Sequence, residues 1–320
     1  MSVDAAPLPP GYELRRPRQG DEPAIAAATA AAENAMLGAV LTTADHIAAD
    51  WQRPRFDPDL DAWLVEAAGR VCVAYASVWD PNPATDFEAR LSVHPSHAAC
   101  GVGDALLSAA EARVAQHAPP RSVERLTLSV ACYEQEEERR RLLLGRGYRV
   151  VREYLDLGYE LRRPVPAPQL PGGIELRPIR LGTDDRAAFE AADDAFAEHF
   201  HVEVETYEEW RQRMFAQRYL DPAFWFLAWD RSTVVGDVIA YPFGGRAYIW
   251  EVAVRRPWRG RGIGLALLLH ELRALKAAGL QHAWLTVDAA NHTGALTVYA
   301  RAHMRLLRTA HVFELNLRPG

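Results

Sequence analysis

Lysine is nearly absent from this sequence, since Lys276 is the only one in 320 residues. A Walker-type phosphate loop needs a lysine directly after its glycines, and Lys276 lies well inside a predicted helix, so that class of nucleotide site is excluded. The formal net charge is −6. This acidic balance gives no general attraction to nucleic acid or to an anionic membrane, so neither is expected as a partner.

Cysteine is scarce as well. Cys72, Cys100 and Cys132 lie far apart with no Cys-x-x-Cys spacing, which argues against the usual zinc and dithiol motifs. The histidines lack the i, i+4 spacing of a helical zinc pair, so no metal is expected. No apolar run reaches the roughly 18 residues of a membrane span, and the N-terminus has no secretory pattern. The sequence therefore predicts a cytoplasmic protein with reduced thiols.

One unit is present twice. Gly11-Tyr-Glu-Leu-Arg-Arg-Pro17 recurs as Gly173-Ile-Glu-Leu-Arg-Pro178, an offset of 173 − 11 = 162 residues. The pair Gly101-x-Gly103 recurs as Gly262-x-Gly264, an offset of 262 − 101 = 161. A proline-rich segment separates the copies, and proline favours an extended, semi-rigid connector. We predict two domains, residues 1–161 and 173–320, joined by a linker over residues 162–172.

The most informative segment is a glycine-rich loop in the second copy, between a predicted strand over Ala247–Val254 and a predicted helix over Gly264–Ala278. Gly260, Gly262 and Gly264 have no Cβ, so the loop can turn tightly and direct successive amide N–H groups at one anion. The first turn of the helix adds unpaired N–H donors and the positive end of its dipole. A pyrophosphate-bearing cofactor is therefore expected here.

Arginines lie on both sides of these glycines. Arg259 and Arg261 can donate paired hydrogen bonds to phosphate oxygens. A dinucleotide fingerprint would need its glycines in the first strand–helix unit and an acidic residue about 20 positions later. Here the glycines come late in the chain and Glu271 comes too soon, so the dinucleotide interpretation is weak.

The string Arg259-x-x-Gly262-x-Gly264 after a strand resembles the acyl-CoA pyrophosphate loop of the GNAT superfamily of N-acetyltransferases. The order of predicted strands and helices in both copies is also similar to that fold. The resemblance implies an α/β (α+β mixed sheet) chain with two tandem GNAT-like domains, each a mixed central sheet flanked by helices. It further implies acetyl-CoA as acyl donor and direct attack on the thioester by a primary amine of a small molecule.

In that family acyl-CoA lies where two parallel strands splay apart, which the resemblance places at Trp250–Val254 and His282–Val287. The cofactor contacts that it implies are Val252, Ala253, Val254, Arg259, Gly260, Arg261, Gly262, Ile263, Gly264 and Asn291.

Two side chains are the catalytic candidates. The segment from Asn291 to Tyr299 resembles the family's helix whose tyrosine faces the CoA sulfur, and a protonated phenol can protonate a departing thiolate. Glu251 lies in an apolar strand, where a carboxylate is costly to bury without a partner, and the resemblance implies that it takes the amine proton. A core tyrosine and a solvent-facing or ion-paired glutamate are the structural alternatives. Asn291 also has two expected roles, a hydrogen bond to the pantetheine arm or a cap on the helix that follows.

The first copy looks eroded at the corresponding positions. Ala98, Ala99 and Cys100 stand where the second copy has Arg259, Gly260 and Arg261, and Leu143 stands at the place of Tyr299. Gln135 likewise replaces Asn291. We therefore predict a degenerate cofactor site in the first copy and catalysis in the second.

Several points stay open at this level. The tandem layout is similar to that of mycothiol synthases, so acetylation of a cysteinyl pseudodisaccharide is one alternative, and a non-catalytic acyl-CoA-binding scaffold is another. A homodimer is also left open. The acidic segment from Asp193 to Glu209 is expected to be solvated or to line the acceptor pocket. Trp225, Trp229 and Trp250 alternate in strands and are expected in the core.

Overall fold

The computed structural model describes residues 8–38, 40–53, 55–82, 85–116, 125–197, 206–215, 219–291 and 293–318. The chain forms two compact units. Unit 1 comprises residues 1–152 and 310–320, and unit 2 comprises residues 153–309. Each unit is a mixed sheet flanked by helices, which confirms the predicted fold class.

The sheet of unit 2 has the strand order β6-β11-β10-β9-β8-β7. Its strands are β6 (Arg149–Glu160), β7 (Ile174–Pro178), β8 (Trp225–Asp230), β9 (Thr233–Phe243), β10 (Arg246–Val254) and β11 (His282–Asp288). Strands β10 and β11 are parallel, and the other neighbours are antiparallel. A single parallel pair inside an antiparallel sheet requires a crossover, which here is the predicted loop and helix.

The sheet of unit 1 repeats this order as β12-β5-β4-β3-β2-β1. Its strands are β1 (Glu13–Arg15), β2 (Ala62–Ala67), β3 (Val71–Asn82), β4 (Asp86–Val93), β5 (Thr127–Tyr133) and the end of β12 (Arg305–Asn316). Its helices are α1 (Glu22–Leu37), α2 (Ala44–Asp50), α3 (Pro58–Asp61), α4 (Val102–Gln116) and α5 (Glu137–Gly145). Here β4 and β5 form the parallel pair. The two units therefore share one topology.

The last strand of each copy completes the sheet of the other unit. Strand β6 ends the first copy and pairs with β11 of unit 2, from Glu160↔His282 to Tyr154↔Asp288. Strand β12 ends the second copy and pairs with β5 of unit 1, from Ala310↔Tyr133 to Asn316↔Thr127. The predicted boundaries at 161 and 173 thus describe repeats in the sequence, whereas the compact units exchange a strand.

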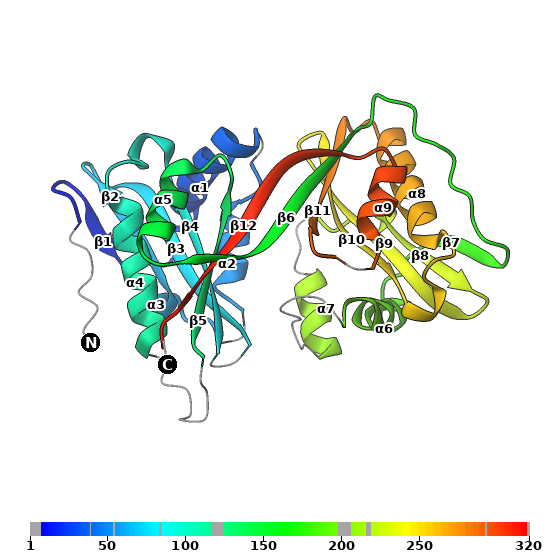
Figure 1. Cartoon of the computed structure of the whole chain (residues 1–320), viewed down its shortest axis with the longest axis horizontal. Helices are drawn as coiled ribbons and strands as arrows, with labels where there is room; N and C mark the ends of the chain where they lie inside the picture. The colour runs from blue at the N-terminus through cyan, green and yellow to red at the C-terminus, as the bar shows by residue number, and fades with distance from the viewer. Residues whose placement is uncertain are drawn as a thin grey trace. The chain divides into compact units, whose positions relative to one another are not determined.

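Helices cover both faces of the unit 2 sheet (Figure 1). Helices α6 (Asp185–Phe196) and α7 (Tyr207–Phe215) pack on one face, called the α6 face below, around a core that includes Trp210, Trp225 and Ile239. Helices α8 (Ile263–Ala277) and α9 (Ala295–Arg301) pack on the other, the α8 face. Gly279 has φ 83°, which confirms the predicted glycine stop after α8. Within the described ranges, no helix is long and apolar enough to cross a membrane.

One carboxyl group is buried in the α8 core without compensation. Glu271 is 0% exposed, and neither side-chain oxygen has a hydrogen-bond partner in the described part of the chain. Burial raises the pKa of Glu271 well above its usual 4.5 and so favours the neutral form of the side chain. In unit 1, Glu111 on α4 is buried as well, but Arg146 donates to it from Nε at 3.0 Å. The two helices thus handle a buried glutamate differently.

We predict that Glu271→Leu raises the free energy of unfolding by about 1–3 kcal/mol near pH 8, because it removes an unpaired polar group from an apolar core. The gain should be smaller near pH 5. An unfolded glutamate ionises near 4.5 while folded Glu271 keeps its proton, so the folded chain binds more protons and loses stability as pH rises above that value. Urea unfolding at the two pH values measures both effects.

The matched control is Glu111→Leu, which leaves Arg146 without its buried partner and should destabilise the protein at both pH values. A loss of stability in Glu271→Leu comparable to that of Glu111→Leu would contradict the assignment of Glu271 as an uncompensated neutral acid.

Candidate active site

Strands β10 and β11 diverge after three paired residues. They pair from Arg246↔His282 to Tyr248↔Trp284 and no further. Beyond that point β10 stays paired with β9 as far as Val254, and β11 stays paired with β6 as far as Asp288. The opening between β10 and β11 beyond Tyr248, called the gap below, is the splay that the sequence resemblance implied.

The backbone of β10 presents amide groups to the gap. Arg255 N donates to Val235 O at 2.9 Å, which fixes the alternation of hydrogen bonding along the strand. In an antiparallel pair, the amides of successive residues point alternately toward and away from the partner strand. The amides of Val252 and Val254 therefore point away from β9, toward the gap. An extended ligand arm can hydrogen-bond to them as a neighbouring strand would.

The phosphate loop, residues 255–264, joins β10 to α8. Gly260 has φ 75° and Gly262 has φ 87°, both in the left-handed region that favours glycine. Gly262 is the N-cap of α8, and its carbonyl accepts the first helical hydrogen bond from Ala266 N at 3.0 Å. The N–H groups of the first turn precede that bond and face outward at the positive end of the helix dipole. The loop therefore has the backbone geometry of an anion site.

Arg259 has a bracing role in this structure. It donates from Nε to Val254 O at 3.1 Å and from Nη2 to Ala195 O at 2.8 Å. Asp194, beside Ala195 at the end of α6, accepts from Arg256 N at 3.0 Å. The exposed Arg261 donates to Pro257 O at 3.1 Å. These contacts hold the loop on β10 and α6, and direct phosphate contact by Arg259 and Arg261 stays a prediction.

A β-bulge sets the direction of Glu251. Ile249 is opposite Ala240 and Glu251 is opposite Ile239, so Trp250 is an extra residue on β10. The bulge places Glu251 on the α6 face, because residues directly opposite each other in antiparallel strands point the same way and Ile239 lies in the α6 core.

Asp237 on β9 shares that face with Glu251, and we call these two residues the carboxyl pair. Asp237 is 0% exposed, and its Oδ2 accepts from Trp225 Nε1 at 3.0 Å. Ala253 is the residue opposite Asp237, so Glu251 lies at the diagonal position on the same face, and the two carboxyl groups interact. Burial raises the pKa of Asp237 to about 7, although the interactions with Glu251 and Trp225 act in the opposite direction. Two ionised carboxylates only accept, so a hydrogen bond between them requires a proton.

An aromatic cluster borders the carboxyl pair. Trp250 is 46% exposed, and its ring lies 6.0 Å from that of Tyr241 and 6.2 Å from that of Tyr248. The expectation that Trp250 is a core residue is wrong, because the bulge moves it to the surface of the sheet. Trp225 is 0% exposed, as expected.

Tyr299 lies on α9 in the α8 core and is 8% exposed. Burial, and to a smaller extent the neighbouring Tyr248, raise the pKa of its phenol to about 12. The group therefore stays protonated at neutral and moderately alkaline pH. Asn291 forms the turn that precedes α9, since its Oδ1 accepts from Thr293 N at 2.9 Å and from Thr293 Oγ1 at 2.7 Å. The N-cap of α9 is Gly294.

Glu251 and Tyr299 flank the sheet from opposite faces. Glu251 lies on the α6 face, whereas Tyr299 belongs to the core of the α8 face. Tyr248, the last β10 residue paired with β11, lies close enough to Tyr299 to affect its pKa. The two predicted catalytic side chains thus lie on opposite faces of the sheet, and their roles stay predictions.

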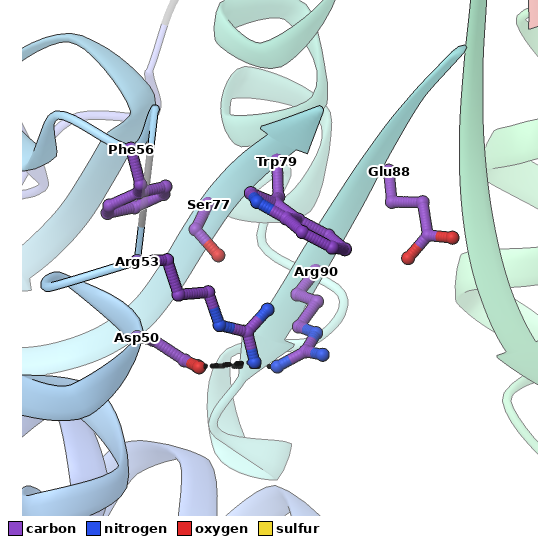
Figure 2. A pocket seen from close by; sticks show the side chains of 7 residues that line it. All are labelled: Asp50, Arg53, Phe56, Ser77, Trp79, Glu88 and Arg90. Carbon is purple, nitrogen blue, oxygen red and sulfur yellow. Dashed lines mark hydrogen bonds and ion pairs between the residues drawn. The ribbon is translucent and has the colours of Figure 1, made fainter. Parts of the chain in front are cut away.

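In unit 1 the position of Glu251 is taken by Arg90. The register of β3 and β4 runs unbroken from Ala74↔Val93 to Trp79↔Glu88, so β4 has no bulge there. Figure 2 shows a small pocket in which dashed lines join Asp50 to the guanidinium groups of Arg53 and Arg90. The Asp50 carboxylate lies 2.7 Å from Arg53 and 3.3 Å from Arg90. A paired guanidinium cannot serve as the base at this position.

The other elements of the site are also changed in unit 1. Tyr148 N donates to Leu143 O at 3.1 Å as Met304 N donates to Tyr299 O at 3.0 Å, so Leu143 occupies the place of the phenol. The N-terminal segment covers the loop of this unit, because Tyr12 Oη lies 2.7 Å from His97 Nδ1. The degenerate cofactor site of the first copy stays a prediction.

Part of the acidic segment lies outside the described residues, namely Glu198, Glu203 and Glu205. Of the remainder, Asp194 binds the phosphate loop, as described above, and Glu209 caps α7 by accepting from Thr206 N at 2.8 Å. In the described part of the chain, no three His, Cys, Asp or Glu side chains are grouped so as to hold a metal ion.

Sequence reasoning missed Asp237. The argument that selected Glu251, a carboxylate inside an apolar strand, applies equally to Asp237 between Val234 and Tyr241. Two carboxyl groups in neighbouring apolar strands indicate a functional site more strongly than one alone. Each can be the hydrogen-bond partner of the other once they share a proton.

Comparisons with known proteins agree with this geometry. The profile described as the Acetyltransferase (GNAT) family matches the chain twice, over residues 29–144 and 187–304. A mycothiol acetyltransferase of Streptomyces scabiei is 34% identical over 241 residues, which are 74% of this chain and 74% of that protein. The crystal structure of a GCN5-related N-acetyltransferase from Sphaerobacter thermophilus has a TM-score of 0.78 and 32% identity, covering 98% of each chain.

A tandem GNAT protein from the clavulanic acid biosynthesis pathway has a TM-score of 0.72 at 18% identity. It covers 97% of this chain and 99% of its own. This similarity shows a shared fold, and the two profile matches confirm the tandem arrangement.

We predict opposite effects of alanine at two glycines of the loop. Gly262→Ala should destabilise the protein by about 1–2 kcal/mol, because φ 87° places a Cβ in the left-handed region. Gly264→Ala should be neutral or stabilising by up to about 1 kcal/mol, because Gly264 lies in α8 and an added Cβ would lie 3.5 Å from Val254 Cγ2, an ordinary contact. Denaturant midpoints measure the difference. Equal loss in both variants would contradict the loop conformation.

Proposed function

Because the chain belongs to the Acetyltransferase (GNAT) family, we propose that it transfers an acetyl group from acetyl-CoA to a primary amine of a small molecule, in unit 2. That the chain is an N-acetyltransferase follows from its family. The proposal concerns the acceptor class, the residues and the unit that acts. The observation that carries it is the gap, with amides of β10 along one edge, Glu251 on one face and Tyr299 on the other.

The residues of unit 2 fit acetyl-CoA. Gly260 and Gly262 give the loop the concave backbone that a pyrophosphate needs, and the first turn of α8 supplies donors. The amides of Val252 and Val254 suit the pantetheine arm and the thioester oxygen. Acetyl-CoA supplies an acyl group whose leaving group is a thiolate. We assign the contacts to Val252, Ala253, Val254, Arg259, Gly260, Arg261, Gly262, Ile263, Gly264 and Asn291.

The side chains around the gap cover the proton transfers of the reaction. Glu251 accepts the proton that the amine loses as it attacks. An amide of β10 donates to the oxygen that gains negative charge. Tyr299, whose raised pKa keeps it protonated at neutral pH, donates toward the departing sulfur.

The differences between the units support catalysis in unit 2 alone. Unit 1 has Arg90 in place of the base, Leu143 in place of the phenol and a loop that Tyr12 covers. Its contribution is structural, because strand β6 of the first copy completes the sheet of unit 2.

A second candidate acceptor is favoured by the relatives. Several that resemble this chain over most of its length carry the name mycothiol acetyltransferase. The chain would then acetylate the cysteinyl amine of a pseudodisaccharide. This acceptor is also a small primary amine, so it uses the same base and the same gap.

We predict that the full chain binds one acetyl-CoA, measured as stoichiometry by isothermal titration. Gly262→Ala should weaken the affinity about tenfold or more, because it distorts the backbone at the pyrophosphate. Gly101→Ala, at the matching loop of unit 1, should leave the affinity unchanged. Two bound acetyl-CoA molecules per chain, or weakening by Gly101→Ala instead, would contradict the assignment to unit 2.

We predict that Tyr299→Phe and Glu251→Gln each lower kcat about 100-fold, because each removes a proton-transfer group. The Kd of acetyl-CoA should change little. Thiol release is measured with acetyl-CoA and glucosamine, spermidine, tyramine, cysteine and a cysteinyl glucosaminide as acceptors. Tyr148→Phe is the control, since that buried phenol in unit 1 lies outside the proposed site. Binding without turnover for every amine would contradict the proposal.

A further inference from the structure

The buried carboxyl group of Asp237 has no part in the reaction as described so far. It lies on β9 behind Glu251, is 0% exposed, and cannot touch an acceptor. Its Oδ2 accepts from the Trp225 indole at 3.0 Å, whereas no described donor reaches Oδ1. An ionised carboxylate would pay a large desolvation penalty here, with one neutral donor as compensation.

The position of Glu251 offers a way out of this imbalance. Glu251 lies diagonally across from Asp237 on the same face of the sheet, and both carboxyl groups only accept when they are ionised. With one proton on the pair, Asp237 becomes a donor, its buried oxygen is satisfied, and a single negative charge remains on the more accessible Glu251. Glu251 is partly exposed beside the gap, so it is the member that solvent and an acceptor amine reach.

The described residues on this face are mostly apolar or neutral around Asp237. Tyr241 on β9 lies near Glu251, Arg213 on α7 and Tyr248 on β10. Tyr241 and Tyr248 are neutral at physiological pH, since burial raises the pKa of each phenol. Helix α6 buries Ala188, Ala191, Ala192 and Ala195, with Asp185 at its first turn near Arg211. An ionised Asp237 would therefore gain little from the described residues beyond the indole of Trp225.

We propose that Asp237 is a positioning residue for acetyl transfer, which as the neutral acid donates a hydrogen bond to Glu251 and keeps that carboxylate ionised and directed at the acceptor amine. The inference rests on the proposed function of Glu251 as the base. The proton balance is simple. The pair begins with one proton, Glu251 takes a second from the attacking amine, and one proton then leaves to solvent from Glu251 because Asp237 has no route to water.

The first test needs no ligand. Aspartate labelled with ¹³C at the carboxyl carbon is followed by NMR in the full chain as a function of pH, and Asp237→Asn identifies the signal. We expect Asp237 to keep its proton at weakly acidic pH. In Glu251→Gln its titration should shift by about one unit, because the carboxyl group that titrates together with it is replaced by an amide.

The second test separates positioning from mere structural support. With the acceptor of the panel that turns over fastest, Asp237→Leu should lower kcat about tenfold or more while the KM of acetyl-CoA changes less than about twofold. Asp237→Asn still donates to Glu251 and should restore kcat to within about threefold of the unsubstituted chain. In the unsubstituted chain, binding of a second proton to the carboxyl pair should give a step in the plot of kcat/KM against pH. That step should be absent in Asp237→Asn.

The control is Glu271→Leu, which removes the other uncompensated buried acid of unit 2 and should leave kcat and its pH profile unchanged. An Asp237 signal that titrates identically with Glu251 or Gln at position 251 would overturn the proposal, as would equal activity loss in Asp237→Leu and Asp237→Asn. If Glu251→Gln were fully active while Asp237 still titrated with Glu251, the pair would stand and the base assignment would fail.

Discussion

The divergence of β10 from β11 is the constraint on which the site depends. Separating two parallel strands leaves amides unpaired, and such groups are costly unless something else binds them. The structure keeps β11 from following β10, because β6 holds its other edge as far as Asp288. Asp156 of β6 reinforces this hold, since it accepts from Thr286 Oγ1 at 2.7 Å and from Arg308 Nε at 3.1 Å. A strand from the first copy therefore borders the gap in unit 2, which gives that copy a structural part in the second unit.

One extra residue in β10, Trp250, accounts for a chemical difference between the two units. Both have a parallel pair that ends early and a loop that leads into a helix, but only β10 carries the bulge. The bulge turns Glu251 toward Asp237 and exposes Trp250 beside it. Without it, β4 keeps a regular register and places Arg90 against Asp50. Erosion of unit 1 is thus a change in strand geometry as well as in side chains, and restoring a glutamate at position 90 would not by itself recreate a base.

How much the sequence reveals depends on the range of the interaction. Local signals were sufficient for the loop glycines, the stop at Gly279 and the duplicated unit, because turn chemistry and repeat spacing act within a short stretch of chain. The strand exchange could not be predicted, since periodicity shows which face of β6 is apolar and not which strand it joins. The bulge could not be predicted either. It exposes Trp250, which was expected in the core, and it places Glu251 on the α6 face. Asp237 was predictable in principle, by the same argument that selected Glu251.

Two fully buried acids of unit 2, Glu271 and Asp237, show why burial alone does not identify a functional carboxyl group. Glu271 and Asp237 are equally hidden from solvent, and desolvation raises the pKa of both. Glu271 is surrounded by leucines of the α8 core, so its proton has no partner with which to exchange. Asp237 has an indole donor on one oxygen and a second carboxyl group on the other side, and that second group reaches the gap. The same desolvation therefore acts on an isolated acid on one face of the sheet and on an acid with a second carboxyl group beside it on the other, and only the second arrangement can share a proton.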